Sequence, residues 1–154
     1  METTVRDIIR KMKASSTMNL KLALALIERV EAEAEKMGVK AVVAVSDASG
    51  RPVAVHCMDG AYIGSFDVAL NKTYTSVAFQ MSTAKLAELA APGGSLYGIQ
   101  HTNEGKIVIF GGGEPLYVDD VMIGAIGVSG GTAEQDTHLG AYGKNILKEV
   151  IAWK

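Results

Sequence analysis

Apolar residues recur at helical spacing in two segments near the start of the chain. The first predicts a short helix over 5–12, followed by a joint over 15–17. The second covers 18–37, with charged residues on the opposite face and Gly38 as a left-handed stop. The pattern indicates a short N-terminal helix, a joint and one long amphipathic helix.

Two extended apolar segments follow, separated by a turn. Residues 39–46 are continuously apolar and rich in β-branched side chains, which is typical of a strand buried on both faces. A turn at 47–50 leads into a second extended segment over 52–58. We predict a hairpin whose first strand lies inside a sheet.

The middle of the chain alternates between helical and loop patterns. Ser65 can cap a helix that places apolar residues on one face and Lys72 on the other, polar face. A shorter helix, capped by Ser82 or Thr83, is predicted to run to about residue 91, where Pro92 stops it. Residues 95–104 are mixed and polar, so we assign them mainly to a loop.

Three strands and a helix complete the predicted order. The strands are 106–110, 114–118 and 121–128, and Thr132 with Gln135 forms a capping box for the last helix. Hairpins at each end with helices between them favour an α+β fold with a largely antiparallel, five-stranded sheet flanked by helices.

Length and composition narrow the class of protein. With 154 residues, we expect a single domain over 1–154, of which 1–17 are the N-terminal helix and joint. A hydrophobic content of 48% is high for a small domain, so we expect a homo-oligomer. A net charge of −2, with no basic stripe, disfavours a nucleic-acid partner.

The sequence also favours one compartment. The longest unbroken apolar stretch, 22–27, is far shorter than the roughly 20 residues that span a bilayer, so we expect no membrane helix. Cys57 is the only cysteine and the first residues lack a secretory signal pattern. We therefore expect a cytoplasmic protein.

Three histidines are candidate ligands for a metal or a haem iron. His101 ranks first because loops carry function disproportionately, followed by His56 in a predicted strand, and His138 lies in the last helix. None belongs to a short-spaced ligand pair, and a lone histidine is more often a surface or hydrogen-bonded residue. On an extended strand His56 and Cys57 point to opposite faces, which disfavours shared ligation.

The turn at Gly130 and Gly131 is a candidate anion site because it directly precedes a helix. Free N–H groups and a partial positive charge at a helix N-terminus suit a carboxylate or phosphate. Asp136 is an alternative occupant of that helix end, and a tight packing turn is the structural alternative. Lys72 either meets an anionic substituent or is solvated. Because nucleotide-binding glycine motifs are absent from the sequence, we expect no nucleotide cofactor.

Five motifs occur in an order that carries a family resemblance. They are Met58–Ala61, Ala69–Phe79, Gly112–Pro115, Gly124–Gly131 and the pair Gln135–Asp136. The chain from about Leu20 onward resembles the GlcG/HbpS family, which includes the C-terminal domain of PduO. The last glycine motif is the most distinctive of the five.

The resemblance to this family implies a fold, an oligomeric assembly, a cofactor and a metabolic setting. It implies a profilin-like three-layer α/β/α arrangement around a five-stranded antiparallel sheet, and assembly as a homo-oligomer. It also implies haem or another tetrapyrrole as the cofactor, with links to glycolate or corrinoid-dependent diol metabolism. ATP-dependent corrinoid adenosylation is not implied, since no adenosyltransferase region accompanies the matched motifs.

Taken together, these observations lead to one hypothesis and two alternatives. We expect a tetrapyrrole-binding protein in which His101 or His56 approaches the iron and Lys72 or the Gly130–Gly131 turn meets the propionates. The first alternative is an enzyme or sensor for a small carboxylate or aldehyde, with Asp136 beside the helix end. The second is a non-catalytic accessory protein of a diol-utilising system. Whether the chain is an enzyme stays open at this level.

Overall fold

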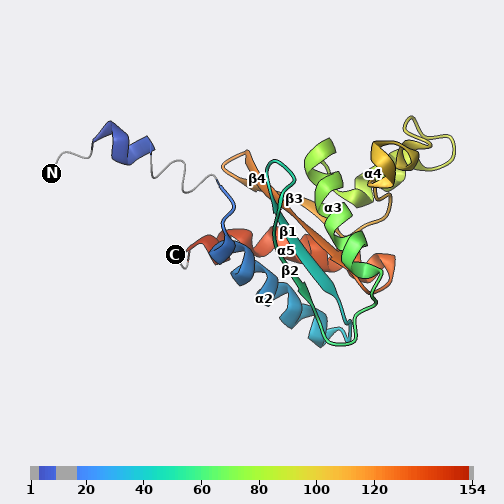
Figure 1. Cartoon of the computed structure of the whole chain (residues 1–154), viewed down its shortest axis with the longest axis horizontal. Coiled ribbons are helices and arrows are strands. Elements are labelled where there is room, and N and C mark those ends of the chain that lie inside the picture. Colours follow the sequence, from blue (N-terminus) through green and yellow to red (C-terminus); the bar gives the residue numbers. More distant parts are fainter. Residues whose placement is uncertain (1–3, 10–16, 153–154) are drawn as a thin grey trace.

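One sheet with helices on both of its faces organises the chain (Figure 1). The structure is a computed structural model that describes residues 4–9 and 17–152. Residues 5–9 are helical as predicted, whereas the predicted end of that helix and most of the joint lie outside the described residues. The further elements are α2 (Leu20–Lys36), β1 (Val42–Asp47), β2 (Pro52–Cys57), α3 (Ser65–Phe79), α4 (Thr83–Ala90), the 3-10 helices η1 (Ile99–His101) and η2 (Asn103–Gly105), β3 (Gly113–Val118), β4 (Val121–Ser129) and α5 (Ala133–Ala152).

The strands lie in the order β2-β1-β4-β3, and every neighbouring pair is antiparallel. β1 is central, as its continuous apolar pattern predicts, because it pairs with β2 on one side and β4 on the other. β2 is an edge strand. The N-terminal end of β1 and the C-terminal ends of β2 and β4 therefore meet at one end of the sheet.

The predicted five-stranded sheet is wrong by one strand. Residues 106–110 form no strand and join no ladder, so the described part of the chain holds a four-stranded sheet. The physical reason is a side chain of α3: the backbone N–H of Val108 donates to the Thr75 hydroxyl at 3.0 Å. This amide is satisfied by a helix side chain instead of a neighbouring strand.

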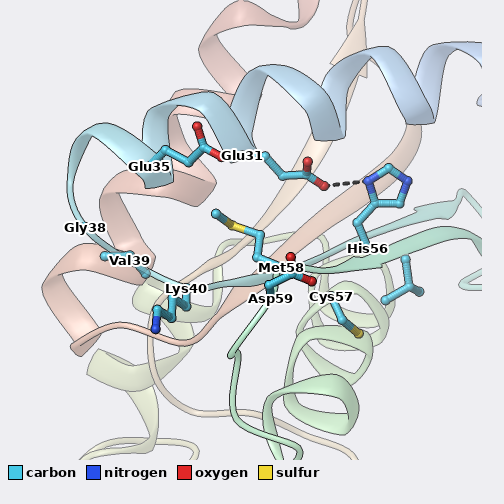
Figure 2. A pocket seen from close by; sticks show the side chains of 10 residues that line it. Glu31, Glu35, Gly38, Val39, Lys40, His56, Cys57, Met58 and Asp59 are labelled. Atoms are coloured by element: carbon cyan, nitrogen blue, oxygen red, sulfur yellow. Dashed lines mark hydrogen bonds and ion pairs between the residues drawn. The ribbon is translucent and has the colours of Figure 1, made fainter.

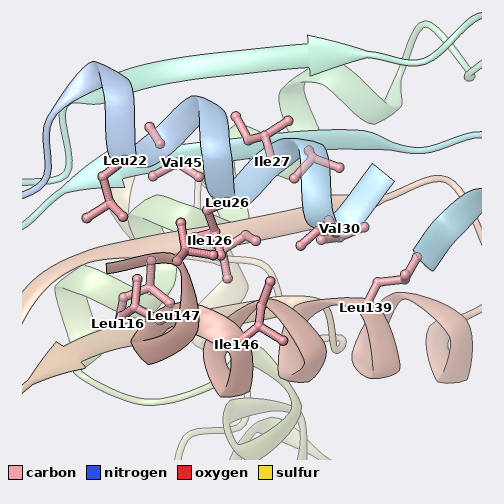
Figure 3. Packing of buried hydrophobic residues seen from close by; sticks show 14 of the residues in the cluster. Leu22, Leu26, Ile27, Val30, Val45, Leu116, Ile126, Leu139, Ile146 and Leu147 are labelled. Atoms are coloured by element: carbon pink, nitrogen blue, oxygen red, sulfur yellow. The ribbon is translucent and has the colours of Figure 1, made fainter. Parts of the chain in front are cut away.

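The main hydrophobic core lies between the sheet and the helix pair α2 and α5 (Figure 3). Aliphatic side chains of both helices meet those of the sheet there. They include Leu22, Leu26, Ile27 and Val30 of α2, Val45, Leu116 and Ile126 of the strands, and Leu139, Ile146 and Leu147 of α5. Full burial of each such side chain contributes roughly 1.5–3 kcal/mol relative to exposure, so this layer anchors the fold.

The opposite face of the sheet carries α3 and is packed with small and polar residues. Here the predicted apolar and polar faces of α3 are wrong: Phe66 is exposed, whereas Lys72 and Ser76 are fully buried. The close approach of the helix explains the difference. A side chain at Gly127 of β4 would lie 2.1 Å from the backbone oxygen of Ala69, so only glycine fits there.

Most predicted helix boundaries are confirmed by their capping interactions. Thr132 and Gln135 form the predicted box, because each backbone N–H donates to the other side chain. Ser82 caps α4 by accepting from a backbone N–H three residues on, and Gly38 has a positive φ of 71°. Ser65, in contrast, is the first residue of α3 and makes no capping bond.

Candidate functional site

His56 lies on the edge strand β2, where α2 covers the sheet. Its Nδ1 and Glu31 Oε1 of α2 are 2.5 Å apart. Because an ionised carboxylate only accepts hydrogen bonds, the Nδ1–H of His56 is the donor and Nε2 is the free ring nitrogen. No further hydrogen-bond partner of this ring is found in the described part of the chain. The imidazole is thus held in one orientation and one tautomer.

A hollow of about 670 Å³ opens beside this pair, and we call it the His56 hollow. Figure 2 shows His56 and Glu31 directed toward each other, while Cys57 points away to the other side of β2. The hollow is lined by Glu31, Glu35, Gly38, Val39, Lys40, Val55, His56, Cys57, Met58 and Asp59. It therefore combines an accessible imidazole with both acidic and basic groups.

Lys40 connects the His56 hollow to the turn before α5. Its side chain packs over Gly60, where an added side chain would lie 2.9 Å from the Lys40 Cδ. Lys40 also lines a neighbouring hollow of about 270 Å³ together with Gly130 and Gly131. At Gly130 an added side chain would lie 2.4 Å from the Lys40 backbone oxygen, so the strand ends approach closely there.

Lys72 is fully buried, so its interpretation as a solvated lysine is wrong. Its Nζ donates to the backbone oxygen of Val128 at 2.6 Å and to Asp136 Oδ2 at 3.2 Å. The ring of Phe110 covers the ammonium group, with its centroid 4.9 Å from Nζ. Burial lowers the pKa of Lys72 from its ordinary value of 10.5, and Asp136 opposes part of that shift.

Asp136 occupies the turn that the sequence offers as an anion site. Its Oδ1 accepts from the backbone N–H of Gly131 at 2.8 Å, while Oδ2 faces Lys72. The negative charge that the N-terminus of α5 favours is therefore supplied by the chain itself. Of the predicted set, the structure brings Lys72, Gly131 and Asp136 into one connected group.

Neither of the other two candidate histidines lines the His56 hollow. His101 is the exposed last residue of η1 and does not line the His56 hollow. His138 contacts Glu33 at 3.1 Å on the surface of α5. Within the described ranges, no group of three or more histidine, cysteine, aspartate or glutamate side chains is arranged to hold a metal ion.

Sequence reasoning missed Glu31, Lys40, and the two buried serines Ser65 and Ser129. Glu31 lies on the charged face of α2, and nothing in the helical pattern marks it as the partner of a residue 25 positions away. The only local signal is at Ser129, which directly precedes the glycine turn. The other three depend on how the sheet places distant segments side by side.

Comparison with known families gives this arrangement its context. The family model described as "Haem degrading protein HbpS-like" matches residues 18–143. The chain belongs to the HbpS-like family. The match begins just before α2 and ends within α5, so it includes the whole sheet, the His56 hollow and the Lys72–Asp136 pair.

Two curated relatives resemble this chain, one of similar length and one about three times as long as the matched region. An uncharacterized 15.0 kDa protein from the dhaT-dhaS intergenic region of Citrobacter freundii is 41% identical over 128 residues, which are 83% of this chain and 90% of that protein. The corrinoid adenosyltransferase PduO of Salmonella typhimurium is 38% identical over 115 residues. Those residues are 75% of this chain but only 33% of PduO.

A solved structure adds a ligand to the comparison. The crystal structure titled as a PduOC:heme complex has a TM-score of 0.73 and 31% sequence identity, and 94% of each chain is covered. The HbpS-like fold of this chain, with helices flanking an antiparallel sheet, is thus shared with a protein that was crystallised with haem. No helix in the described ranges is long and apolar enough to cross a membrane.

Proposed function

We propose that this HbpS-like chain binds haem in the His56 hollow, with Nε2 of His56 as the axial ligand to the iron. The observation that carries the proposal is the Glu31–His56 hydrogen bond. Histidines that ligate metals usually donate their other ring N–H to a carboxylate or carbonyl, which fixes the ring and raises its basicity. His56 has that arrangement, and Nε2 is left free.

The residues of the hollow fit the group in size and in chemistry. A volume of about 670 Å³ lies within the range of roughly 300–1,000 Å³ that is usual for cofactor sites. Val39 and Met58 provide apolar contact, and the Lys40 ammonium group suits a propionate carboxylate, whereas Glu35 and Asp59 would repel one placed beside them. When bound, haem supplies an iron centre that accepts electrons or small ligands. The chain positions the imidazole and supplies the counter-charge.

The structure favours His56 over the other predicted ligand and Lys40 over Lys72. His101 is exposed, and no hydrogen-bond partner orients its ring in the described part of the chain. Lys72 is fully buried and committed to Val128 and Asp136, so a propionate would have to displace those contacts. These considerations support a site at β2 and α2.

Haemin titration of the purified protein tests the proposal. We expect a saturable shift of the Soret band in the wild type and a loss of affinity of at least about tenfold in His56→Ala. Glu31→Gln keeps the shape of the side chain but removes its charge. We expect it to lower the affinity for haemin, since changes to groups that support a metal ligand usually lower metal affinity about 10–100-fold. His101→Ala is the matched control and should bind haemin as the wild type does.

Cys57 provides a second control on the other face of β2. It lines an apolar hollow of about 350 Å³ together with Tyr62, Ile63 and Phe66. A Soret shift that depends on Cys57→Ser but not on His56→Ala would place the macrocycle there and contradict the assignment to His56. The absence of any saturable shift in the wild type would contradict haem binding itself.

Three wider expectations stay predictions of the sequence. They are the links to glycolate and corrinoid-dependent diol metabolism, cytoplasmic residence, and the role as a non-catalytic accessory protein. Support for the pathway links comes from the likeness to PduO, which covers a third of that enzyme's length.

A further inference from the structure

A further hollow lies at the start of α5, between that helix, β4 and α3. Its volume is about 220 Å³, and Ser65, Ser129 and Asp136 are among the residues that line it. The rings of Tyr62 and Phe110 form part of its wall. We call it the serine hollow. It shares no lining residue with the His56 hollow; the hollow of about 270 Å³ that Lys40 lines lies between the two and borders both.

Ser129 of β4 and Ser65 of α3 both line the serine hollow, on the side of the sheet that α3 covers. Side chains alternate along a strand, so Ser129 lies on the same face as Gly127, which packs against Ala69 and Lys72 of α3. Ser65 is the first residue of α3. Both serines are strongly buried, with exposed fractions of 6% for Ser65 and 7% for Ser129.

Neither hydroxyl has a hydrogen-bond partner anywhere in the described part of the chain. The side-chain oxygens that are both sealed from solvent and unpaired belong to Ser46, Ser76 and Gln100, and not to these two serines. The hydroxyls of Ser65 and Ser129 therefore open on to the serine hollow. Because these two hydroxyls are not sealed, each stays available as a donor and an acceptor for a polar ligand that enters the hollow.

The charges around the serine hollow decide which kind of ligand it favours. Asp136 lines the hollow, and its carboxylate already accepts from the Gly131 N–H and from Lys72. The positive end of α5 and the buried ammonium group are thus compensated within the chain. A second carboxylate would be repelled by Asp136, which argues against the small carboxylate that the sequence offers as one alternative ligand.

A neutral ligand with hydroxyl groups matches the groups that remain. Its hydroxyls can donate to the unused lone pairs of Asp136 and can both donate to and accept from the two serines. Its C–H surface can lie against Phe110 and Tyr62. We propose that the serine hollow binds a small neutral molecule with neighbouring hydroxyl groups, independently of haem. A volume of about 220 Å³ is below the usual range for drug-sized ligands and suits a molecule of a few carbon atoms.

Backbone amide NMR titration with glycerol as the probe, and acetate as the charged comparison, tests this proposal. We expect saturable glycerol shifts at the amides of residues 65, 129, 130 and 131, and no saturable shifts there with acetate. In the double variant Ser65→Ala/Ser129→Ala the apparent Kd should rise at least tenfold. Its fold should persist, because the deleted hydroxyls make no bond in the protein.

Two further variants separate this proposal from its alternatives. Ser95→Ala removes an exposed hydroxyl and should leave glycerol binding unchanged. His56→Ala should also leave it unchanged, so that a failure of the haem proposal does not affect the outcome. Absence of saturable glycerol shifts, equal shifts in the double variant, or saturation by acetate alone would each overturn the proposal.

Discussion

The Lys72 ammonium group shows how a single residue joins three elements of this fold. It extends from α3 and reaches the backbone of β4 through Val128 and the first turn of α5 through Asp136. Its burial carries a desolvation cost, which is the reason that its pKa is lowered. The pair is better understood as a means of fixing the Gly130–Gly131 turn than as a source of net stability.

We predict that Lys72→Met lowers the free energy of unfolding by about 3–5 kcal/mol, because it leaves Asp136 buried without its counter-charge. Urea denaturation measures this change. In the double variant Lys72→Met/Asp136→Asn most of the loss should be recovered, since a neutral amide oxygen still accepts from the Gly131 N–H. A single variant within about 0.5 kcal/mol of the wild type would show that the pair is unimportant.

At the scale of elements, β3 is joined to α5 by a partly buried ion pair. Glu114 of β3 has Oε2 3.6 Å from the Nζ of Lys144. Burial raises the pKa of Glu114 from its ordinary value of 4.5, and Lys144 opposes part of this effect. The folded state therefore keeps the Glu114 proton to a higher pH than the unfolded state does.

This raised pKa predicts a pH-dependent stability difference between the wild type and Glu114→Gln. Below pH 4.5 both side chains are neutral, so the two proteins should be similar. As pH rises from 4.5 through the folded-state pKa, the wild type should lose stability relative to the variant. Thermal unfolding from pH 4 to 8 measures the difference. It should grow when Lys144→Gln is added to both proteins, and a flat difference would contradict the prediction.

Sequence patterns predicted the elements whose boundaries are set by local chemistry. The Thr132–Gln135 box, the Ser82 cap and the Gly38 stop depend on neighbouring residues, and all three are confirmed. Residues 106–110 have a strand-like composition, yet the backbone N–H of Val108 donates to the Thr75 side chain, 33 positions away, instead of to a neighbouring strand. The predicted fifth strand was wrong because the local sequence pattern does not indicate that a helix side chain will accept this hydrogen bond.

The members of the candidate site were predictable only in part. The sequence named Lys72, Asp136 and Gly131, which lie in or beside recognisable motifs, and the structure joins these three in one hydrogen-bonded group. Their bonds to one another were not predicted, because a lysine among Thr and Ser residues has the pattern of a solvated helix face. His56 was among the candidates, whereas its partner Glu31 was hidden in the charged face of α2.

For the whole molecule, a notable surface feature is an apolar patch formed by Tyr62, Ile63 and Phe66. Ile63 is 97% exposed, and the patch borders the hollow around Cys57. Exposed apolar patches on small domains commonly mark interaction surfaces. The patch is where we expect the self-association that the hydrophobic composition predicts.

We predict that the wild type sediments as a homo-oligomer and that Ile63→Lys weakens its association at least tenfold, because a charge would be buried in the contact. Sedimentation velocity over a range of concentrations measures this effect. Val121→Lys, at an exposed apolar position on the β3–β4 hairpin, is the matched control. Equal association of Ile63→Lys and the wild type would exclude the patch as the contact.

The two faces of the sheet also differ in how much sequence change they can accept. Between the sheet and the α2 and α5 pair, aliphatic side chains interdigitate, and exchanges among Leu, Ile and Met of similar volume usually cost less than 1.5 kcal/mol. Between the sheet and α3, positions such as Gly113 and Gly127 accept no larger residue, because an added side chain there would lie within 3 Å of backbone atoms of α3. Variation within this fold is thus permitted on one side and restricted on the other, and the serine hollow lies at the end of the restricted side.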